Sequence, residues 1–87
     1  MNNEVNYDYQ LGLKYYLGKE VEQDYAKAKT WFEKAAEQDD VNSQYMLGKM
    51  YYYGEGVKQD YPKAKTWFEK AAKQGNPEAV KALERFK

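Results

Sequence analysis

The side chains that could carry acid–base or nucleophilic chemistry are few in this 87-residue chain. The chain has no histidine and no cysteine, so the usual general base, the usual zinc ligand and a thiolate nucleophile are all missing. Ser43 is the only serine, and no basic residue stands at a recognisable motif spacing from it. Because a serine nucleophile needs an adjacent base, the sequence predicts no catalytic site and no enzyme.

The acidic and basic side chains are spaced for ion pairs on helix surfaces. Lys29 and Glu33, Lys65 and Glu69, and Glu69 and Lys73 lie four residues apart, which is the separation at which side chains meet on one face of a helix. We interpret these residues as a solvated surface rather than as a catalytic acid and base.

Two short segments are candidate sites for an ion or a phosphate group. Asp39 and Asp40 could hold a cation weakly, but helix capping explains at least one of these carboxylates. The segment Gly54-Glu55-Gly56 is typical of a turn between helices and lacks the longer pattern of a phosphate-binding loop. We therefore expect no metal and no cofactor.

Composition and charge exclude several classes of partner. Fourteen Lys and Arg balance fourteen Asp and Glu, which argues against a protein that binds nucleic acid by neutralising phosphates. No apolar run approaches the roughly 20 residues of a membrane span, and residues 1–6 lack the basic and apolar regions of a signal peptide. We expect a cytoplasmic protein that binds neither nucleic acid nor membrane, or a mature form whose leader has been removed.

The elements that carry these residues repeat along the chain with an offset of 36 residues. Residues 9–38 and 45–74 are identical at 21 of 30 positions, and a third copy begins at residue 75. In the second copy, Asp40 is expected to cap a helix over about 41–53 that stops at Gly54, and Asp60 to cap the next helix. Asn76 and Pro77 begin a last helix.

The repeated pattern predicts an all-α fold. Apolar residues recur at helical spacing and no segment alternates like a strand, so antiparallel helix pairs are expected to stack into a short right-handed α/α solenoid of five helices. Gly12 and Gly48 inside helices are expected to permit close helix contact. The large buried area is expected to come from Trp31, Phe32, Trp67 and Phe68.

The repeated positions resemble the Sel-1-like repeat, a relative of the tetratricopeptide repeat. The resemblance covers nearly the whole chain from about Tyr9, and it implies a protein-binding scaffold without conserved chemistry. It also implies a single domain over residues 1–87, with repeat one at about 5–40, repeat two at about 41–75 and a capping helix at about 76–87. The residues that carry it in the second copy are Leu47-Gly48, Tyr51-Tyr52, Gly54-x-Gly56-Val57, Asp60, Lys63-Ala64, Trp67-Phe68, Lys70-Ala71-Ala72 and Gly75.

The first copy departs from the second in its loop and in its first helix. Glu20 replaces Gly56, so this loop is expected to be strained or reshaped. Asp39 stands where the third copy has a glycine, and it is expected to adopt the left-handed conformation itself. Lys14 occupies the place of Met50, which weakens the apolar face of the first helix. We expect the N-terminal unit to be the less stable one.

The candidate binding residues follow from helical periodicity and from the resemblance to tetratricopeptide grooves. The first helices of successive units are expected to line the concave side of the solenoid. Tyrosine is favoured for recognition there because it combines a large contact area with a hydrogen-bonding tip. Tyr16 and Tyr52 have an alternative interpretation as packing residues. The predicted partner-binding residues are Tyr9, Leu13, Tyr16, Tyr45, Lys49, Tyr52, Tyr53, Lys81 and Arg85.

Two features predict self-association. Residues 1–44 hold 5 basic and 9 acidic residues and residues 45–87 hold 9 basic and 5 acidic, so opposite ends could pair head to tail, unless the asymmetry is neutral surface drift. The first helix is apolar on much of its circumference and no helix precedes it. This predicts a homodimer, or a stable partner, at that edge.

We therefore expect a non-enzymatic module that binds a protein or peptide through a concave, tyrosine-rich face. By resemblance, an alternative is a small bacterial immunity or regulatory protein that neutralises a toxin or effector. Some secreted, cysteine-rich relatives are associated with binding or hydrolysing β-lactams, but the cysteines are missing here. The near-identity of the two copies also leaves open a designed or trimmed repeat fragment.

Overall fold

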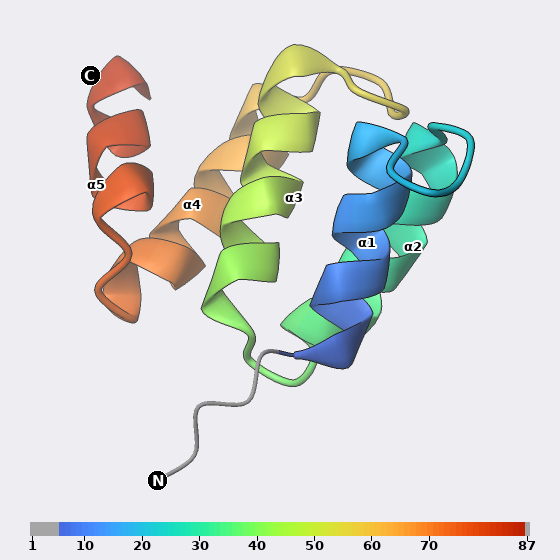
Figure 1. Cartoon of the computed structure of the whole chain (residues 1–87). Helices are drawn as coiled ribbons and strands as arrows, with labels where there is room; N and C mark the ends of the chain where they lie inside the picture. The colour runs from blue at the N-terminus through green and yellow to red at the C-terminus, as the bar shows by residue number, and fades with distance from the viewer. Residues whose placement is uncertain (1–5, 87) are drawn as a thin grey trace, which may run out of the picture.

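Five α-helices and one short 3₁₀ segment form residues 6–86, the part of the chain that the computed structural model describes (Figure 1). No strand occurs in these residues, so the all-α prediction is confirmed. Residues 1–5, and with them the expected start of repeat one at residue 5, lie outside the described residues. The elements are α1 (Tyr7–Leu17), α2 (Tyr25–Ala36), α3 (Val41–Tyr53), α4 (Tyr61–Lys73), α5 (Pro77–Leu83) and the 3₁₀ segment η1 (Glu84–Phe86).

Each α-helix begins at an Asn or Asp that caps it. The side-chain oxygens of Asn6, Asp24, Asp40, Asp60 and Asn76 each accept a hydrogen bond from the backbone N–H three residues later. Such a bond pairs one of the N–H groups that a helix start leaves without an intrahelical partner. The caps predicted at residues 40, 60 and 76 are confirmed, and they fix where each helix starts along the repeat.

The two long loops have the same backbone shape. Gly18 and Gly54 end α1 and α3 with φ angles of 71° and 72°, and Glu20 has a φ of 69° where Gly56 has 72°. The first loop is therefore not reshaped. It is strained, because a side chain in the left-handed conformation costs about 1–2 kcal/mol. Asp39 also takes this conformation, with a φ of 64°, as its position predicts.

The helices lie in two layers. Figure 1 shows α1, α3 and α5 side by side in front, with α2 and α4 behind them. Consecutive helices pack against each other, and the molecule measures 38 × 37 × 18 Å. The smallest dimension accommodates two helix layers with axes about 8–10 Å apart. We call the exposed side of the layer formed by α1, α3 and α5 the front face.

The core contains two phenylalanine rings, each packed against a glycine. A Cβ atom added to Gly12 would lie 2.6 Å from the ring carbons of Phe32, and one added to Gly48 would lie 2.6 Å from those of Phe68. Both rings are buried. The two glycines therefore permit the close approach of paired helices that the sequence predicts. Small buried residues complete these contacts; they are Ala28, Ala35, Ala36, Ala64 and Ala71.

The two tryptophans lie at the edge of the core. Trp31 and Trp67 are partly buried, less completely than Phe32 and Phe68, and Trp67 packs against the first core cluster. The Nζ atom of Lys34 lies 4.9 Å from the ring centroid of Trp31, and Lys70 covers Trp67 at the same distance. Because a lysine covers one side of each indole, these rings form part of the surface rather than the centre of the core.

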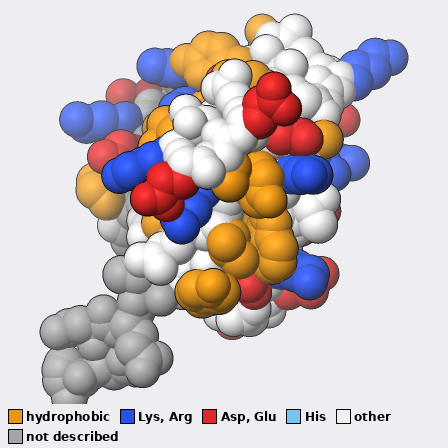
Figure 2. Space-filling view, turned by 45° about the vertical axis from the view of Figure 1, so that its right-hand side comes forward, with side chains coloured by type: hydrophobic (Ala, Val, Ile, Leu, Met, Phe, Trp, Pro, Cys, Tyr) orange, Lys and Arg blue, Asp and Glu red, His pale blue; other side chains and the backbone are white. Residues whose placement is uncertain are grey.

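The first helix is better covered than its apolar sequence suggests. Four of its seven large apolar side chains pack against the first core cluster, and of these seven only Tyr7 and Leu17 are strongly exposed, at 71% and 62%. Figure 2 turns the α1 side of the molecule forward and shows hydrophobic patches separated by charged side chains. The packed residues of this helix, which are Tyr9, Leu13, Tyr15 and Tyr16, are partly buried. The homodimer itself stays a prediction.

Candidate functional site

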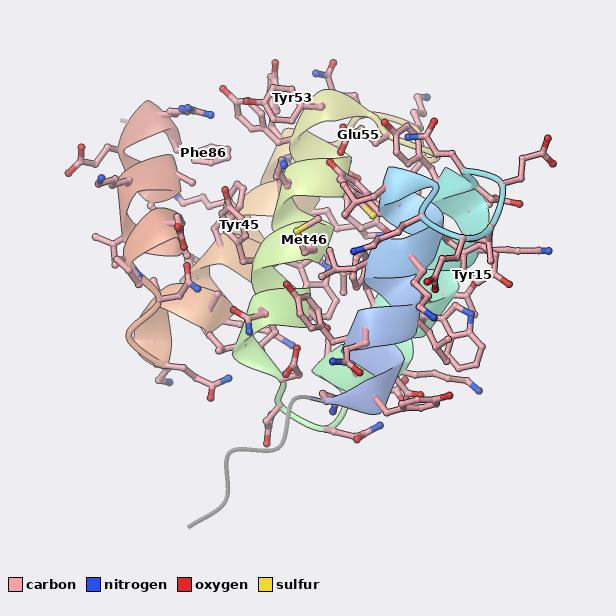
Figure 3. The ribbon with its side chains drawn as sticks, in the orientation of Figure 1. Tyr15, Tyr45, Met46, Tyr53, Glu55 and Phe86 are labelled. Carbon is pink, nitrogen blue, oxygen red and sulfur yellow. The ribbon has the colours of Figure 1, made fainter. Side chains whose placement is uncertain are left out.

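The front face is hollowed between α3 and α5. This hollow has a volume of about 210 Å³, and we call it the α3–α5 groove. Figure 3 shows Tyr45 and Phe86 lying between the two helices, with Tyr53 at the end of α3. The groove is lined by Tyr45, Lys49, Tyr52, Tyr53, Phe68, Glu78, Lys81, Ala82 and Arg85.

Six of the nine predicted binding residues line this one groove. The other three lie on α1, where they pack against the first core cluster instead; these are Tyr9, Leu13 and Tyr16. Helical periodicity also places Glu78 on the outward face with Lys81 and Arg85, and Glu78 does line the groove. Phe68 reaches the groove from α4 in the rear layer, and a pattern read along the front helices carries no signal for it.

The floor of the groove is apolar and its rim is polar. Phe68 and Ala82 are almost fully buried, and the ring of Tyr45 packs against that of Phe68 with centroids 5.8 Å apart. Burial raises the pKa of Tyr45 above its ordinary value, and the nearby Glu78 carboxylate raises it further. Tyr53 is 53% exposed at the rim.

Three basic side chains, Lys49, Lys81 and Arg85, converge on the rim. Arg85 Nη1 donates a hydrogen bond of 3.1 Å to the hydroxyl of Tyr53, and its guanidinium lies 5.7 Å from the ring centroid of Tyr52. Lys49 Nζ lies 5.4 Å from the ring of Tyr16. Among residues 6–86, none of these three cations forms an ion pair. Aromatic rings therefore position Lys49 and Arg85, and all three charges lack an ion-pair partner among the described residues.

Tyr16 and Tyr52 form equivalent contacts in the two repeats. Tyr16 packs on Tyr25 with centroids 5.2 Å apart, and Tyr52 packs on Tyr61 at 5.0 Å. The hydroxyl of Tyr16 also donates a hydrogen bond of 2.8 Å to Glu55 in the next repeat. Burial and this bond raise the pKa of Tyr16 well above its ordinary value. These contacts support the packing interpretation of both residues, although Tyr52 also borders the groove.

Polar residues that line a second hollow form hydrogen bonds with one another. It lies beside Trp67, near the first turn of α3. Gln74 Nε2 donates hydrogen bonds of 3.0 Å to the Asp39 carbonyl oxygen and to Gln44 Oε1. Because these polar groups already pair with one another, this hollow offers a partner less than the α3–α5 groove does.

The remaining side chains that could carry chemistry occupy structural positions. Ser43 Oγ is buried without a hydrogen-bond partner, so no base lies within reach of it. Of the three helix pairs considered, Lys29 and Glu33 form an ion pair of 3.0 Å, and the pairs at Glu69 do not form in the described structure. Asp40 caps α3. Within residues 6–86, no three potential metal ligands come together, and every helix is too short or too polar to cross a lipid bilayer.

Comparisons with known proteins place the chain among repeat proteins of bacterial origin. It is similar to a solved Sel1 repeat protein from Oxalobacter formigenes, with 45% identity and a TM-score of 0.89 over 92% of this chain and 23% of that one. It is also similar to a protective antigen present in uropathogenic Escherichia coli strains that displays an SLR fold, with 43% identity and a TM-score of 0.84 over 87% of this chain and 16% of that one. Cysteine-rich protein B of Helicobacter pylori is 34% identical, with a TM-score of 0.82 over 87% of this chain and 57% of that one.

The chain spans less than two thirds of each of these solved chains. A comparison with curated proteins found no match. The model of the Sel1 repeat matches twice, at residues 7–40 and 41–76. Each match contains one complete helix pair, α1 with α2 and α3 with α4. On this evidence the chain belongs to the Sel1 repeat family, and its fold is the α/α solenoid of that family.

Proposed function

We propose that this chain is a non-enzymatic interaction module that binds a protein or peptide through its front face, with the α3–α5 groove as the contact site. Repeats of this family commonly serve as protein-interaction modules. The observation that carries the proposal is the convergence of six predicted binding residues on one groove with a buried apolar floor. An apolar centre with a polar, aromatic rim is the usual composition of a recognition site.

The non-enzymatic part of the proposal is supported by the surroundings of the single serine. A serine nucleophile requires a base within hydrogen-bond distance, and Ser43 Oγ is buried without any partner. The groove itself offers tyrosines, lysines, one arginine and one glutamate. Its volume of about 210 Å³ is also below the roughly 300–1,000 Å³ of typical small-molecule sites. These features favour a peptide side chain over a small substrate as the occupant.

The proposal is tested by capture with matched variants. The tagged protein is incubated with lysate of the cells that express it, in parallel with a Tyr53→Ala/Arg85→Ala double variant. Both side chains are exposed and bond to each other, so their removal leaves the core intact. A Lys58→Ala/Lys65→Ala variant, altered outside the groove, is the control.

We expect mass spectrometry to identify a protein that the wild type and the control retain and that the groove variant loses. Circular dichroism should show equal helicity for all three proteins. Equal retention by the groove variant would contradict a binding site in the α3–α5 groove. Turnover of a substrate by the purified chain would contradict the non-enzymatic assignment.

A further inference from the structure

The α3–α5 groove differs in charge from the equivalent junction between α1 and α3. The positions of Lys49, Lys81 and Arg85 correspond, one repeat earlier, to Leu13, Tyr45 and Lys49. The earlier junction therefore has one cation where the α3–α5 groove has three. Since the earlier junction stacks its helices with one cation, the two additional charges are not required to stack the repeats.

Two of the three cations of the groove are held by aromatic side chains, and none of the three forms an ion pair within residues 6–86. Arg85 is fixed by the Tyr53 hydroxyl and the Tyr52 ring, and Lys49 lies over the Tyr16 ring. The carboxylates nearby are Glu78, which lines the groove without an ion pair, and Glu55, which accepts the hydrogen bond from Tyr16. Three cations against one lining carboxylate leave a net positive rim.

The size of the groove limits what can enter it. A volume of about 210 Å³ corresponds to about seven waters at the roughly 30 Å³ that each occupies in the liquid. This space suits one apolar side chain lying on Phe68 and Ala82, not a helix or a folded domain. The backbone on either side of that anchor would pass close to the cations.

We infer that the groove binds an acidic peptide segment, in which one apolar anchor side chain enters the groove and flanking Asp or Glu side chains pair with Lys49, Lys81 and Arg85. The inference rests on the proposed function and specifies the chemistry of its partner. Complementary charge steers such a segment to the groove and fixes its register, and the fixed arginine fork is suited to carboxylates. A partner of net positive charge would meet three like charges at the rim.

The experiment selects peptides from a random library displayed on phage, with the immobilised full chain as bait. We expect the enriched sequences to contain an apolar residue flanked by Asp and Glu, in excess over the starting library. The most enriched peptide is then synthesised with a fluorescein label and titrated by fluorescence anisotropy. Its affinity should fall as salt is raised, because salt screens exposed charges.

Two charge-matched double variants test whether the rim charges are responsible for peptide binding. Lys81→Glu/Arg85→Glu changes the rim, and Lys58→Glu/Lys65→Glu makes the same change of charge outside the groove. We expect the rim variant to bind the peptide at least about tenfold more weakly, and the control to change its affinity less than about twofold. Circular dichroism and thermal unfolding confirm that both variants fold.

The outcomes separate this inference from the proposed function. If the selected peptides have no excess of acidic residues but bind Tyr53→Ala more weakly than the wild type, the inference of an acidic partner fails. The groove would still be the binding site. Peptides that bind equally to the Tyr53→Ala and rim variants, or no enrichment at all, would contradict both. If the wild type alone forms a concentration-dependent dimer in sedimentation and the rim variant does not, the groove binds a second copy and the peptide inference fails.

Discussion

The first helices of the two repeats have the same backbone but different neighbours. Three of the buried residues of α3 stand where α1 has exposed residues, and two of these three belong to the cluster that α3 shares with α2. Figure 3 shows one of the buried residues, Met46, between α3 and α1. Residues that contact their own partner helix, such as Gly12 and Gly48, are identical. The differing positions are Ser43, Met46 and Met50 in α3, against Tyr7, Gln10 and Lys14 in α1.

The two loops differ in sequence for the same reason, which is that only one of them contacts another repeat. A Cβ atom added to Gly56 would lie 2.5 Å from the Cβ atom of Tyr25, in the first repeat. Glu20 has the same φ, but its side chain is exposed and pairs with Lys14 at 3.0 Å. Glycine is therefore favoured at residue 56 for two reasons, the φ angle and the contact with Tyr25, whereas at residue 20 only the φ angle favours it. Repeat-to-repeat differences in this chain indicate which positions contact another repeat.

Giving position 50 the residue of position 14 should have the largest effect on the free energy of unfolding. Met50→Lys removes a fully buried side chain, which costs roughly 2–5 kcal/mol for Met→Ala, and it adds a charge without a buried partner. We expect the free energy of unfolding, measured by urea denaturation, to fall by at least about 4 kcal/mol or the chain to unfold. Lys14→Met should change it little. Similar losses for the two variants would contradict the difference between these faces.

Gly56→Ala should have the second largest effect. The positive φ costs a side chain about 1–2 kcal/mol, and the contact with Tyr25 adds an overpacking cost of about 1–3 kcal/mol. We expect a loss of roughly 2–4 kcal/mol in urea denaturation. Glu20→Ala is the matched control, because it has the same φ without the contact and should leave stability nearly unchanged. A loss of only about 1–2 kcal/mol in Gly56→Ala would assign the whole cost to φ and none to the contact with Tyr25.

Much of the fold could be predicted from the sequence because its signals are local. Caps such as Asp40 and stops such as Gly54 act within one turn of their own helix, so they need no knowledge of distant neighbours. The partial exposure of the tryptophans could not be predicted, because burial depends on how many neighbours reach a ring. Lys34 and Lys70 cover Trp31 and Trp67 from the solvent side, and hydrophobicity alone does not indicate this.

The candidate site could be predicted only in part. Helical spacing placed Tyr45, Lys49 and Tyr53 on one face, because periodicity fixes direction within a helix. It could not show that α5 lies beside that face closely enough to form a groove, or that Phe68 supplies the floor from the rear layer. Nor did it separate Tyr16 from the binding set, since the Glu55 hydrogen bond crosses 39 positions of sequence.

Tyr16→Phe tests the hydrogen bond that joins the two repeats. Loss of the bond to Glu55 should cost about 1 kcal/mol at neutral pH. The folded-state pKa of Tyr16 is raised above its ordinary value of 10, so its contribution to stability is complete below that pH and is lost as pH rises above it. The variant should therefore lose less stability than the wild type between neutral and strongly alkaline pH.

The matched control for this prediction is Tyr52→Phe, since Tyr52 occupies the equivalent position. The pKa values of Tyr9 and Tyr45 are also raised by burial, so both variants should keep part of the alkaline loss. Urea denaturation at a series of pH values measures the effect. Identical pH profiles for wild type and Tyr16→Phe would show that the bond to Glu55 does not stabilise the stack.

Ser43→Ala should stabilise the chain by about 1 kcal/mol. The buried Oγ atom has no hydrogen-bond partner, and an unpaired buried polar group costs roughly 1–3 kcal/mol, part of which the lost packing of one atom offsets. The third repeat already has alanine here, at the buried residue Ala79. A fall in the urea midpoint would indicate that the hydroxyl has a partner in solution, such as a water.

Glu20→Gly should give the smallest change, because two effects of opposite sign meet at this residue. Glycine relieves the left-handed strain, but it removes the exposed ion pair with Lys14, which is worth little in water. We expect a slight net gain in thermal unfolding temperature. The same substitution made in a Lys14→Ala background should give a larger gain, because the ion pair is already absent there. Equal gains in the two backgrounds would mean that the ion pair contributes nothing, and a loss in both would mean that the backbone at residue 20 is not strained.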